Sequence, residues 1–225
     1  MIRQVDFNTA VWRSHTTAQG LAGRQVEHVE QDHEGYLWFA TSHSGVSRFD
    51  GESFHTFTRH DGLCGNQVMH ILQDRAERLW FGTLDGGLCY RDGDGFHHIV
   101  DAVGERGMVM HLFEDRRGRL WYAGREALGY IEEGVARDLL ADYVTCFGEP
   151  PKGCYGIAEN DDGGIWLGTQ CVAQYDGSTF SDGTADGALR FPGGAYFAVA
   201  PGADDTIWIG GAGEVIRRDG FDAHS

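Results

Sequence analysis

Three histidines stand ten residues before three regularly spaced tryptophans: His28, His70 and His111. Three imidazoles with one open coordination position are the ligand set of a catalytic zinc or another transition metal, provided that they converge on one ion at about 2.1 Å. One hypothesis is therefore a divalent metal cofactor in a metal-dependent lyase or hydrolase. The competing interpretation is that a duplicated repeat has copied a core histidine that hydrogen-bonds to neighbouring backbone.

The tryptophans behind these histidines mark a repeat. Five of them recur at intervals of 41 to 45 residues: Trp38, Trp80, Trp121, Trp166 and Trp208. An Asp or Asn turn precedes most copies, and the apolar run Leu79–Thr83 is typical of a strand buried on both faces. A repeat of this length is typical of one four-stranded propeller blade. The second copy predicts strands over 67–73, 79–83, 87–93 and 95–101.

The two ends of the chain complement each other. Residues 11–21 align with 53–63, so Val11–Thr16 is predicted to be a fourth strand with no blade before it, and the fifth copy lacks its fourth strand. Sharing one sheet between both termini removes free sheet edges. We predict a single all-β domain, residues 1–225, forming a closed five-bladed β-propeller. The alternative is a piece of a longer array. The predicted blades are 26–59, 67–101, 108–142, 153–184 and 195–221 joined by 11–16.

The turn-Leu-Trp pattern, with its Gly-Leu linker at Asp61-Gly62-Leu63, resembles the two-component regulator propeller repeat. That resemblance implies a propeller fold and a recognition role, because in this family the repeats form the sensory part of bacterial hybrid histidine kinases, usually outside the cytoplasm. No kinase core, receiver domain or membrane span is visible in the sequence. Any signalling output is therefore expected to come from a separate signalling chain.

Recognition by a propeller uses the loops at one rim of its central channel, which differ here from copy to copy. A small molecule, a glycan or a protein is expected to bind there. The candidate ligand-binding residues are His43, Asn66, Gln67, Asp85, Arg125, Glu126, Tyr155 and Gln170. An acidic rim residue such as Asp85 is expected to contribute little to stability.

Few sequence motifs indicate that the chain is an enzyme. No G-x-S-x-G nucleophile elbow is present, and the acidic turns lack the distal Glu of a calcium loop. A carboxylate pair for glycoside hydrolysis stays an alternative, with these candidates: Glu27, Glu30, Asp85 and Glu126. The favoured interpretation is a non-enzymatic recognition module with no catalytic residue and no cofactor, ahead of the metal-dependent enzyme and of a purely structural interaction platform.

The composition of the chain restricts the partners that it is expected to bind and the compartment in which it is expected. The 34 acidic and 18 basic residues give a net charge of −16, which disfavours nucleic acid and anionic membrane surfaces as partners. No run approaches the ~20 apolar residues of a membrane span. The five cysteines are odd in number and show no C-x-x-C motif. Reduced thiols in a cytoplasmic protein are therefore predicted, or an extracytoplasmic location if a leader has been removed.

Overall fold

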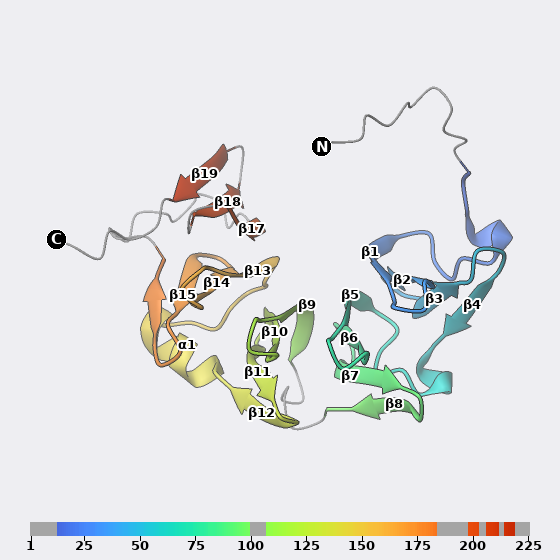
Figure 1. Cartoon of the computed structure of the whole chain (residues 1–225), viewed down its shortest axis with the longest axis horizontal. Coiled ribbons are helices and arrows are strands. Elements are labelled where there is room, and N and C mark those ends of the chain that lie inside the picture. Colours follow the sequence, from blue (N-terminus) through green and yellow to red (C-terminus); the bar gives the residue numbers. More distant parts are fainter. Residues whose placement is uncertain (1–12, 100–106, 184–197, 203–205, 212–213, 219–225) are drawn as a thin grey trace.

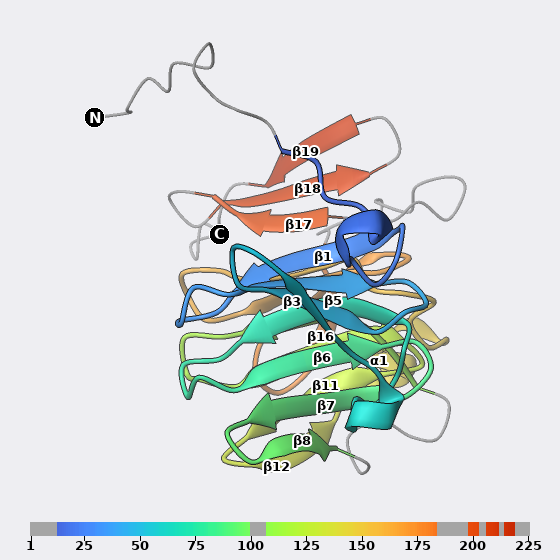
Figure 2. The ribbon, with the colours of Figure 1, turned by 90° about the vertical axis from the view of Figure 1, so that its right-hand side faces the viewer.

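The computed structural model describes residues 13–99, 107–183, 198–202, 206–211 and 214–218. Five antiparallel sheets lie side by side along an arc around a common axis (Figure 1). The first strand of each sheet is the innermost, and Figure 2 shows that the strands run along the axis. The arrangement is that of a propeller, in agreement with the sequence-based prediction of an all-β fold.

Among the described residues, strands pair in chain order within every sheet, with four in each of the first four sheets and three in the fifth. The first two sheets contain β1 (Val26–Gln31), β2 (Leu37–Thr41), β3 (Val46–Phe49), β4 (Phe54–Phe57), β5 (Val68–Gln73), β6 (Leu79–Thr83), β7 (Gly87–Asp92) and β8 (Gly95–His98). The other three contain β9 (Met108–Glu114), β10 (Leu120–Arg125), β11 (Leu128–Glu132), β12 (Val135–Asp138), β13 (Gly156–Glu159), β14 (Ile165–Gly168), β15 (Val172–Tyr175), β16 (Phe180–Asp182), β17 (Ala198–Pro201), β18 (Ile207–Gly211) and β19 (Glu214–Arg218).

The tryptophan of each of the first four sheets fills the space between that sheet and the next. Trp80, for example, belongs to one buried cluster with Leu112, Leu120 and Tyr122 of the third sheet. The same relation joins Trp38 to the second sheet, Trp121 to the fourth and Trp166 to the fifth. All four indoles are buried. The core therefore consists of four equivalent joints between sheets.

An aspartate anchors the tryptophan in each of the first three sheets. Asp74 accepts the backbone N–H of Ala76 at 3.0 Å and that of Arg78 at 2.9 Å, which closes the turn between β5 and β6. Its second oxygen accepts the indole N–H of Trp80 at 2.7 Å. The corresponding indole bonds are 2.7 Å long in the first sheet and 2.8 Å in the third. The sequence predicted that an aspartate closes this turn, but not that it also binds the indole.

A polar contact reinforces the first three joints. Residues near the end of an inner strand accept a backbone N–H from the turn of the preceding sheet. Gln73 accepts from His33 at 2.8 Å, and Glu159 accepts from Arg116 at 2.8 Å. Glu114 accepts from Arg75 in the same way. Pro201, which has no side-chain acceptor, occupies this position in the fifth sheet.

The linkers that lead into the first and second sheets have the same structure. Each contains a short 3₁₀ helix, η2 (Thr17–Gln19) or η3 (Arg59–Asp61), with a side-chain capping box and a left-handed glycine after it. The alignment of the two segments is therefore confirmed for the linker itself.

The strand predicted over Val11–Thr16 is not found where the structure can be described. Residues 11 and 12 lie outside the described residues, and Arg13–Thr16 belong to no strand. Instead, the ring of His15 packs against Phe49 and Phe54 of the first sheet, with centroids 5.0 and 5.6 Å apart. The described part of this segment is therefore held by aromatic contact with the first sheet.

In the described part of the chain, the arc is open between its two ends (Figure 1). Each inner strand packs against the next one from β1 to β17, whereas no comparable packing joins β17 to β1 in the described part of the chain. Trp208 is accordingly 43% exposed. Closure into a ring of five blades stays a prediction.

A helix that the sequence analysis did not predict lies between the third and fourth sheets. It is α1 (Leu140–Phe147), and its Tyr143 is completely buried against the core of the fourth sheet. The Tyr143 hydroxyl bonds to Thr169 Oγ1 at 2.7 Å. This helix fixes the connection between these two sheets.

The joints predict unequal effects of the same substitution in two sheets. Trp80→Ala is expected to lower the free energy of unfolding by ~3–5 kcal/mol, because it leaves a cavity between two sheets and removes the indole hydrogen bond to Asp74. Trp208→Ala, at an exposed indole, is expected to cost less than about 1 kcal/mol. Urea denaturation of both variants measures the difference, and equal losses would contradict the assignment of the core.

Candidate binding site

The three predicted histidines lie together on the inner strands of the first three sheets. His28 is on β1, His70 on β5 and His111 on β9. The rings of His28 and His70 stack with centroids 3.9 Å apart, and those of His70 and His111 are 4.4 Å apart. The repeat thus brings the three imidazoles to equivalent places, as the sequence predicted.

Burial determines the charge of this stack. Burial lowers the pKa of His70 to about 2 and that of His111 to about 4, and charge repulsion within the stack acts in the same direction. Burial also lowers the pKa of His28, whose Nδ1 accepts the backbone N–H of Ile71 at 3.4 Å. The buried Nδ1 atoms of His70 and His111 have no hydrogen-bond partner in the described structure. The stack is therefore uncharged near neutral pH.

The stack does not have the geometry of a metal site. The rings of His28 and His70 stack and that of His111 is tilted by 37° against His70, whereas a metal ion needs ligand nitrogens that converge on one point. Among the described residues, no group of three or more His, Cys, Asp or Glu side chains could hold a metal ion. Metal binding by the three histidines stays a prediction. The core interpretation agrees with His28, which accepts a backbone N–H.

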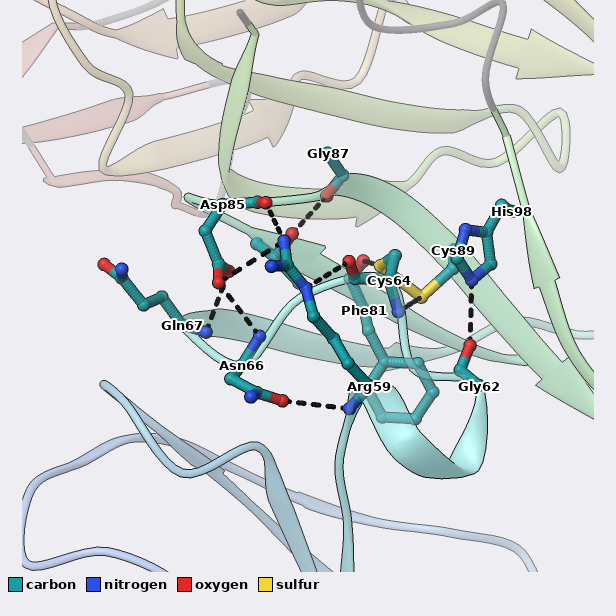
Figure 3. The surroundings of a disulfide bond; sticks show 11 residues. Arg59, Gly62, Cys64, Asn66, Gln67, Phe81, Asp85, Gly87, Cys89 and His98 are labelled. Carbon is teal, nitrogen blue, oxygen red and sulfur yellow. Dashed lines mark hydrogen bonds and ion pairs between the residues drawn. A yellow bond between two sulfur atoms is a disulfide. The ribbon is translucent and has the colours of Figure 1, made fainter. Parts of the chain in front are cut away.

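The rim residues of the first two sheets are held by internal contacts (Figure 3). The Asp85 carboxylate accepts the backbone N–H of Asn66 at 3.2 Å and that of Gln67 at 2.9 Å. Arg59 approaches the same carboxylate at 3.5 Å, and its backbone N–H donates to the Asn66 side chain at 3.0 Å. Asp85 therefore holds the linker in place, which corrects the expectation that it contributes little to stability. His43 is exposed in the loop of the first sheet.

A disulfide fastens the same linker to the second sheet. Cys64 is bonded to Cys89 of β7, with Cα atoms 5.8 Å apart (Figure 3). The prediction of reduced thiols throughout is therefore wrong for this pair. It failed because the linker crosses back over the sheet, and this contact is invisible in the cysteine spacing. The free thiols of the described chain are Cys146, Cys154 and Cys171.

The rim residues of the third and fourth sheets form a second group. The Gln170 side chain accepts the backbone N–H of Lys152 and donates to the Pro150 carbonyl, both at 3.0 Å. The backbone N–H of Glu126 donates to the Pro151 carbonyl at 3.2 Å. Gln170 and the Glu126 backbone thus hold the loop over residues 150–153.

Two side chains of the second group have exposed surface near this loop. Arg125 is exposed, and Tyr155 is 40% exposed. A Cβ atom at Gly153 would lie 3.0 Å from the Tyr155 ring and 3.4 Å from Met110 Sδ, so glycine allows the ring and the thioether to come close. We call Met110, Arg125, Gly153 and Tyr155 the Tyr155 surface. Sequence reasoning had placed Arg125 and Gly153 in variable loops and had chosen Tyr155 as a candidate, whereas Met110, on the inner strand β9, carried no signal.

The four carboxylates considered for glycoside hydrolysis have separate surroundings. Asp85 is engaged by the linker, and Glu27 accepts hydrogen bonds from Ser42 and Gln25. Burial raises the pKa of Glu30, although this residue also accepts the backbone N–H of Gln73 at 3.2 Å. Glu126 is exposed and has a left-handed backbone. Of the four, Glu30 has the environment of an acid, but its hydrogen bond connects two sheets.

Comparison with known proteins agrees with the fold and with the repeat. Residues 62–85 match the two component regulator propeller family. This stretch contains the Gly-Leu linker, β5, β6 and the loop of Asp85, so the resemblance seen in the sequence is confirmed there. No curated protein sequence matches the chain significantly.

Solved propeller structures are similar to the chain at low sequence identity. The extracellular domain of a putative hybrid two component system from B. thetaiotaomicron has a TM-score of 0.67 at 20% identity, over 87% of this chain and 29% of that one. A second such domain from B. thetaiotaomicron gives 0.65 and 18%, over 88% and 27%. Catalytically inactive virginiamycin B lyase from Staphylococcus aureus with quinupristin gives 0.61 and 16%, over 91% and 72%. The chain spans less than a third of the two sensor domains. At this identity the likeness shows the fold alone.

The described helices include none with the length and apolar character of a membrane span.

The histidine stack predicts a loss of stability in acid. The pKa values of His70 and His111 in the folded chain lie below the ordinary value of 6.5, so the unfolded chain binds protons that the folded chain does not as pH falls below that value. At pH 5 each histidine should lower the free energy of unfolding by about 2 kcal/mol relative to pH 8. Urea denaturation between these pH values measures it. His70→Phe, which keeps a ring in the stack, should flatten the profile, whereas His43→Phe in an exposed loop should not.

The contacts of Asp85 predict a loss of stability at the rim. Asp85→Ala leaves the N–H groups of Asn66 and Gln67 without their acceptor and is expected to cost about 1–3 kcal/mol in unfolding free energy. Asp94→Ala, which removes an exposed carboxylate from a hairpin turn, is the matched control and should have little effect. Similar melting temperatures for the two variants would contradict the role given to Asp85.

Proposed function

We propose that this chain is a non-enzymatic recognition module, in which the Tyr155 surface binds a ligand at the rim of the propeller. The observation that carries the proposal is that two rim side chains are exposed beside loops held by internal contacts. Asp85, Asn66 and Gln170 hold loops, and Arg125 and Tyr155 have exposed surface near the supported loop. Exposed side chains on a rigid support are the usual form of a recognition surface.

The chemistry of the Tyr155 surface favours a glycan that carries a carboxylate, among the small-molecule, glycan and protein ligands considered. A tyrosine ring offers a flat apolar face together with a polar hydroxyl, which suits the face of a sugar ring. A guanidinium binds a carboxylate through two parallel hydrogen bonds. Because the chain as a whole is strongly acidic, a cationic side chain at the rim is a local feature that gives such a ligand a place to bind.

A sensory role outside the cytoplasm is consistent with this proposal. The sensor structures to which the chain is similar are described as extracellular domains of putative hybrid two component systems. The Cys64–Cys89 disulfide supports the same compartment, since disulfides persist in oxidising environments. These two observations replace the cytoplasmic location predicted from the cysteine count. We further propose that a separate signalling chain carries the output.

The metal-dependent lyase or hydrolase is the second candidate. Its support is the set of three uncharged imidazoles near the axis, together with the fold likeness to a lyase structure. The stacked geometry gives it less weight than the recognition module. A stoichiometric transition metal in protein purified without chelator would favour the enzyme.

We also propose the closed ring of five blades that the sequence predicted. Its support is the match between the two linkers, each with its capping box. The position of Arg13–Thr16 beside the first sheet weighs against a shared last sheet.

Binding at the Tyr155 surface predicts a selective loss in two variants. A screen of glycans with and without a carboxylate, read by thermal shift, should identify an acidic glycan that stabilises the chain. Tyr155→Ala and Arg125→Ala should each weaken its binding at least about tenfold, the equivalent of 1.4 kcal/mol. Val135→Ala, an exposed apolar residue on the outer strand β12, is the control. A ligand whose affinity is unchanged in both rim variants would refute this site.

A further inference from the structure

Arg125 and Lys152 lie directly opposite each other at the rim between the third and fourth sheets. Arg125 ends β10, and an isolated antiparallel bridge pairs it with Lys152 of the linker that leads into the fourth sheet. Side chains of residues paired in this way stand on the same face, with Cβ atoms about 4.5–5.5 Å apart. Both residues are exposed. The fold therefore holds two cationic side chains next to each other.

Such a pair is unexpected from the composition of the chain. The net charge is −16, and Lys152 is the single lysine of the sequence. Like charges directly opposite each other on paired strands are destabilising. The scaffold therefore gains no stability from this pair, whereas a ligand with two acidic groups would be attracted to both side chains. The pair has the chemistry of a site for two anionic groups.

The linker backbone holds Lys152 in place without using its side chain. Lys152 and Asn66 stand at the same position of the repeat, fourteen residues before a tryptophan. In both linkers a loop side chain accepts the backbone N–H of this residue, Asp85 in the second sheet and Gln170 in the fourth. Asn66 also supports its own linker, because its side chain accepts the N–H of Arg59. The Lys152 side chain extends into solvent instead, on a backbone that is equally well held.

A carboxylate of the same linker covers the ammonium group of Lys152. Both oxygens of Glu149 approach Lys152 Nζ, at 3.0 and 3.1 Å. The Lys152 and Glu149 side chains are 66% and 49% exposed, and an ion pair between exposed side chains contributes little to stability. Glu149 therefore stands where an anionic group of a ligand would bind, and it can be displaced at a small cost.

We propose that Arg125 and Lys152 together bind two acidic groups of one glycan, and that Glu149 is a competitor within the chain, displaced from Lys152 by the second group. The inference rests on the ligand-binding role proposed above for Arg125. It specifies the ligand as a glycan with two anionic groups, either two carboxylates or a carboxylate and a sulfate ester. A glycan with one carboxylate would bind Arg125 and leave Glu149 on Lys152. The site therefore prefers the doubly charged ligand.

Two matched pairs of probes test this preference. Digalacturonate is compared with its monomethyl ester, and the disaccharide of glucuronate and N-acetylgalactosamine is compared with and without a sulfate ester. Titration calorimetry should show at least about tenfold tighter binding of one doubly charged probe than of its singly charged partner. Lys152→Gln should remove this preference. Equal affinities within both pairs, no binding of either doubly charged probe, or a preference that survives in Lys152→Gln would overturn the proposal.

Glu149→Gln tests the competitor. This variant should bind the doubly charged probe at least about threefold more tightly, because the amide no longer neutralises Lys152, and should bind the singly charged partner as before. Glu132→Gln, which removes an exposed carboxylate at the opposite end of the third sheet, is the control for net charge. The role of Glu149 is refuted by an equal gain in both variants or by no gain in Glu149→Gln.

The single lysine gives a direct readout of occupancy. An N-hydroxysuccinimide ester acylates lysine side chains, and mass spectrometry of the peptide that contains Lys152 follows its modification. With the doubly charged probe at about ten times its dissociation constant, acylation of Lys152 should slow about tenfold relative to a lysine-containing reference peptide in the same solution. An unchanged rate would show that the second acidic group does not reach Lys152, and the proposal would fail.

The same measurements distinguish failure of this inference from failure of the proposed function. Binding that falls in Arg125→Ala and Tyr155→Ala but is unchanged in Lys152→Gln refutes the inference and keeps the recognition site. Binding that requires Arg125 and Lys152 but not Tyr155 supports the inference and refutes the Tyr155 surface. Arg117→Ala, which removes an exposed arginine from the turn at the opposite end of β10, is the control for loss of a positive charge and should leave every affinity unchanged.

Discussion

The packing of one indole between two sheets is the interaction on which the rest of this structure depends. In the first three sheets an aspartate closes the turn before the tryptophan strand and also accepts the indole N–H. Local turn formation and packing between sheets are thus coupled through one carboxylate. In the fourth sheet Asn160 closes the turn, and the buried indole nitrogen of Trp166 has no partner in the described structure. The aspartate therefore refines a joint that apolar packing already forms.

The scaffold explains which side chains remain for recognition. A rim built from connections must satisfy the backbone groups of its own loops before it can offer polar groups to a ligand. Asp85 and Gln170 perform this internal task, and the disulfide between Cys64 and Cys89 adds a covalent constraint in the second sheet. The imidazoles near the axis are the opposite case. Their residue type is typical of a metal site, yet they are buried and uncharged, and two of them lack a partner for Nδ1 in the described structure. Residue type alone therefore does not tell whether a side chain supports a loop or binds a ligand.

Sequence by itself determined the repeat, the order of strands and the chemistry of the turns. Leu79–Thr83 forms β6 with the predicted bounds, because a short apolar run between turn residues is a local signal. The position of the three histidines on equivalent inner strands also follows from the repeat, since equivalent positions in duplicated units occupy equivalent places. The helix α1 was missed because it replaces a linker in a single copy, outside the repeated pattern.

Only the tertiary structure decided how residues from different strands meet. It placed Cys64 against Cys89 across 25 residues of sequence, turned the histidines into a stack, and showed that Asp85 supports a linker. It also left Val29 of the first sheet and Trp208 of the fifth exposed in the described structure, and closure between these two sheets stays a prediction. The physical reason is that periodicity defines the environment of a position within one sheet, whereas contacts between side chains depend on the angle and spacing between sheets.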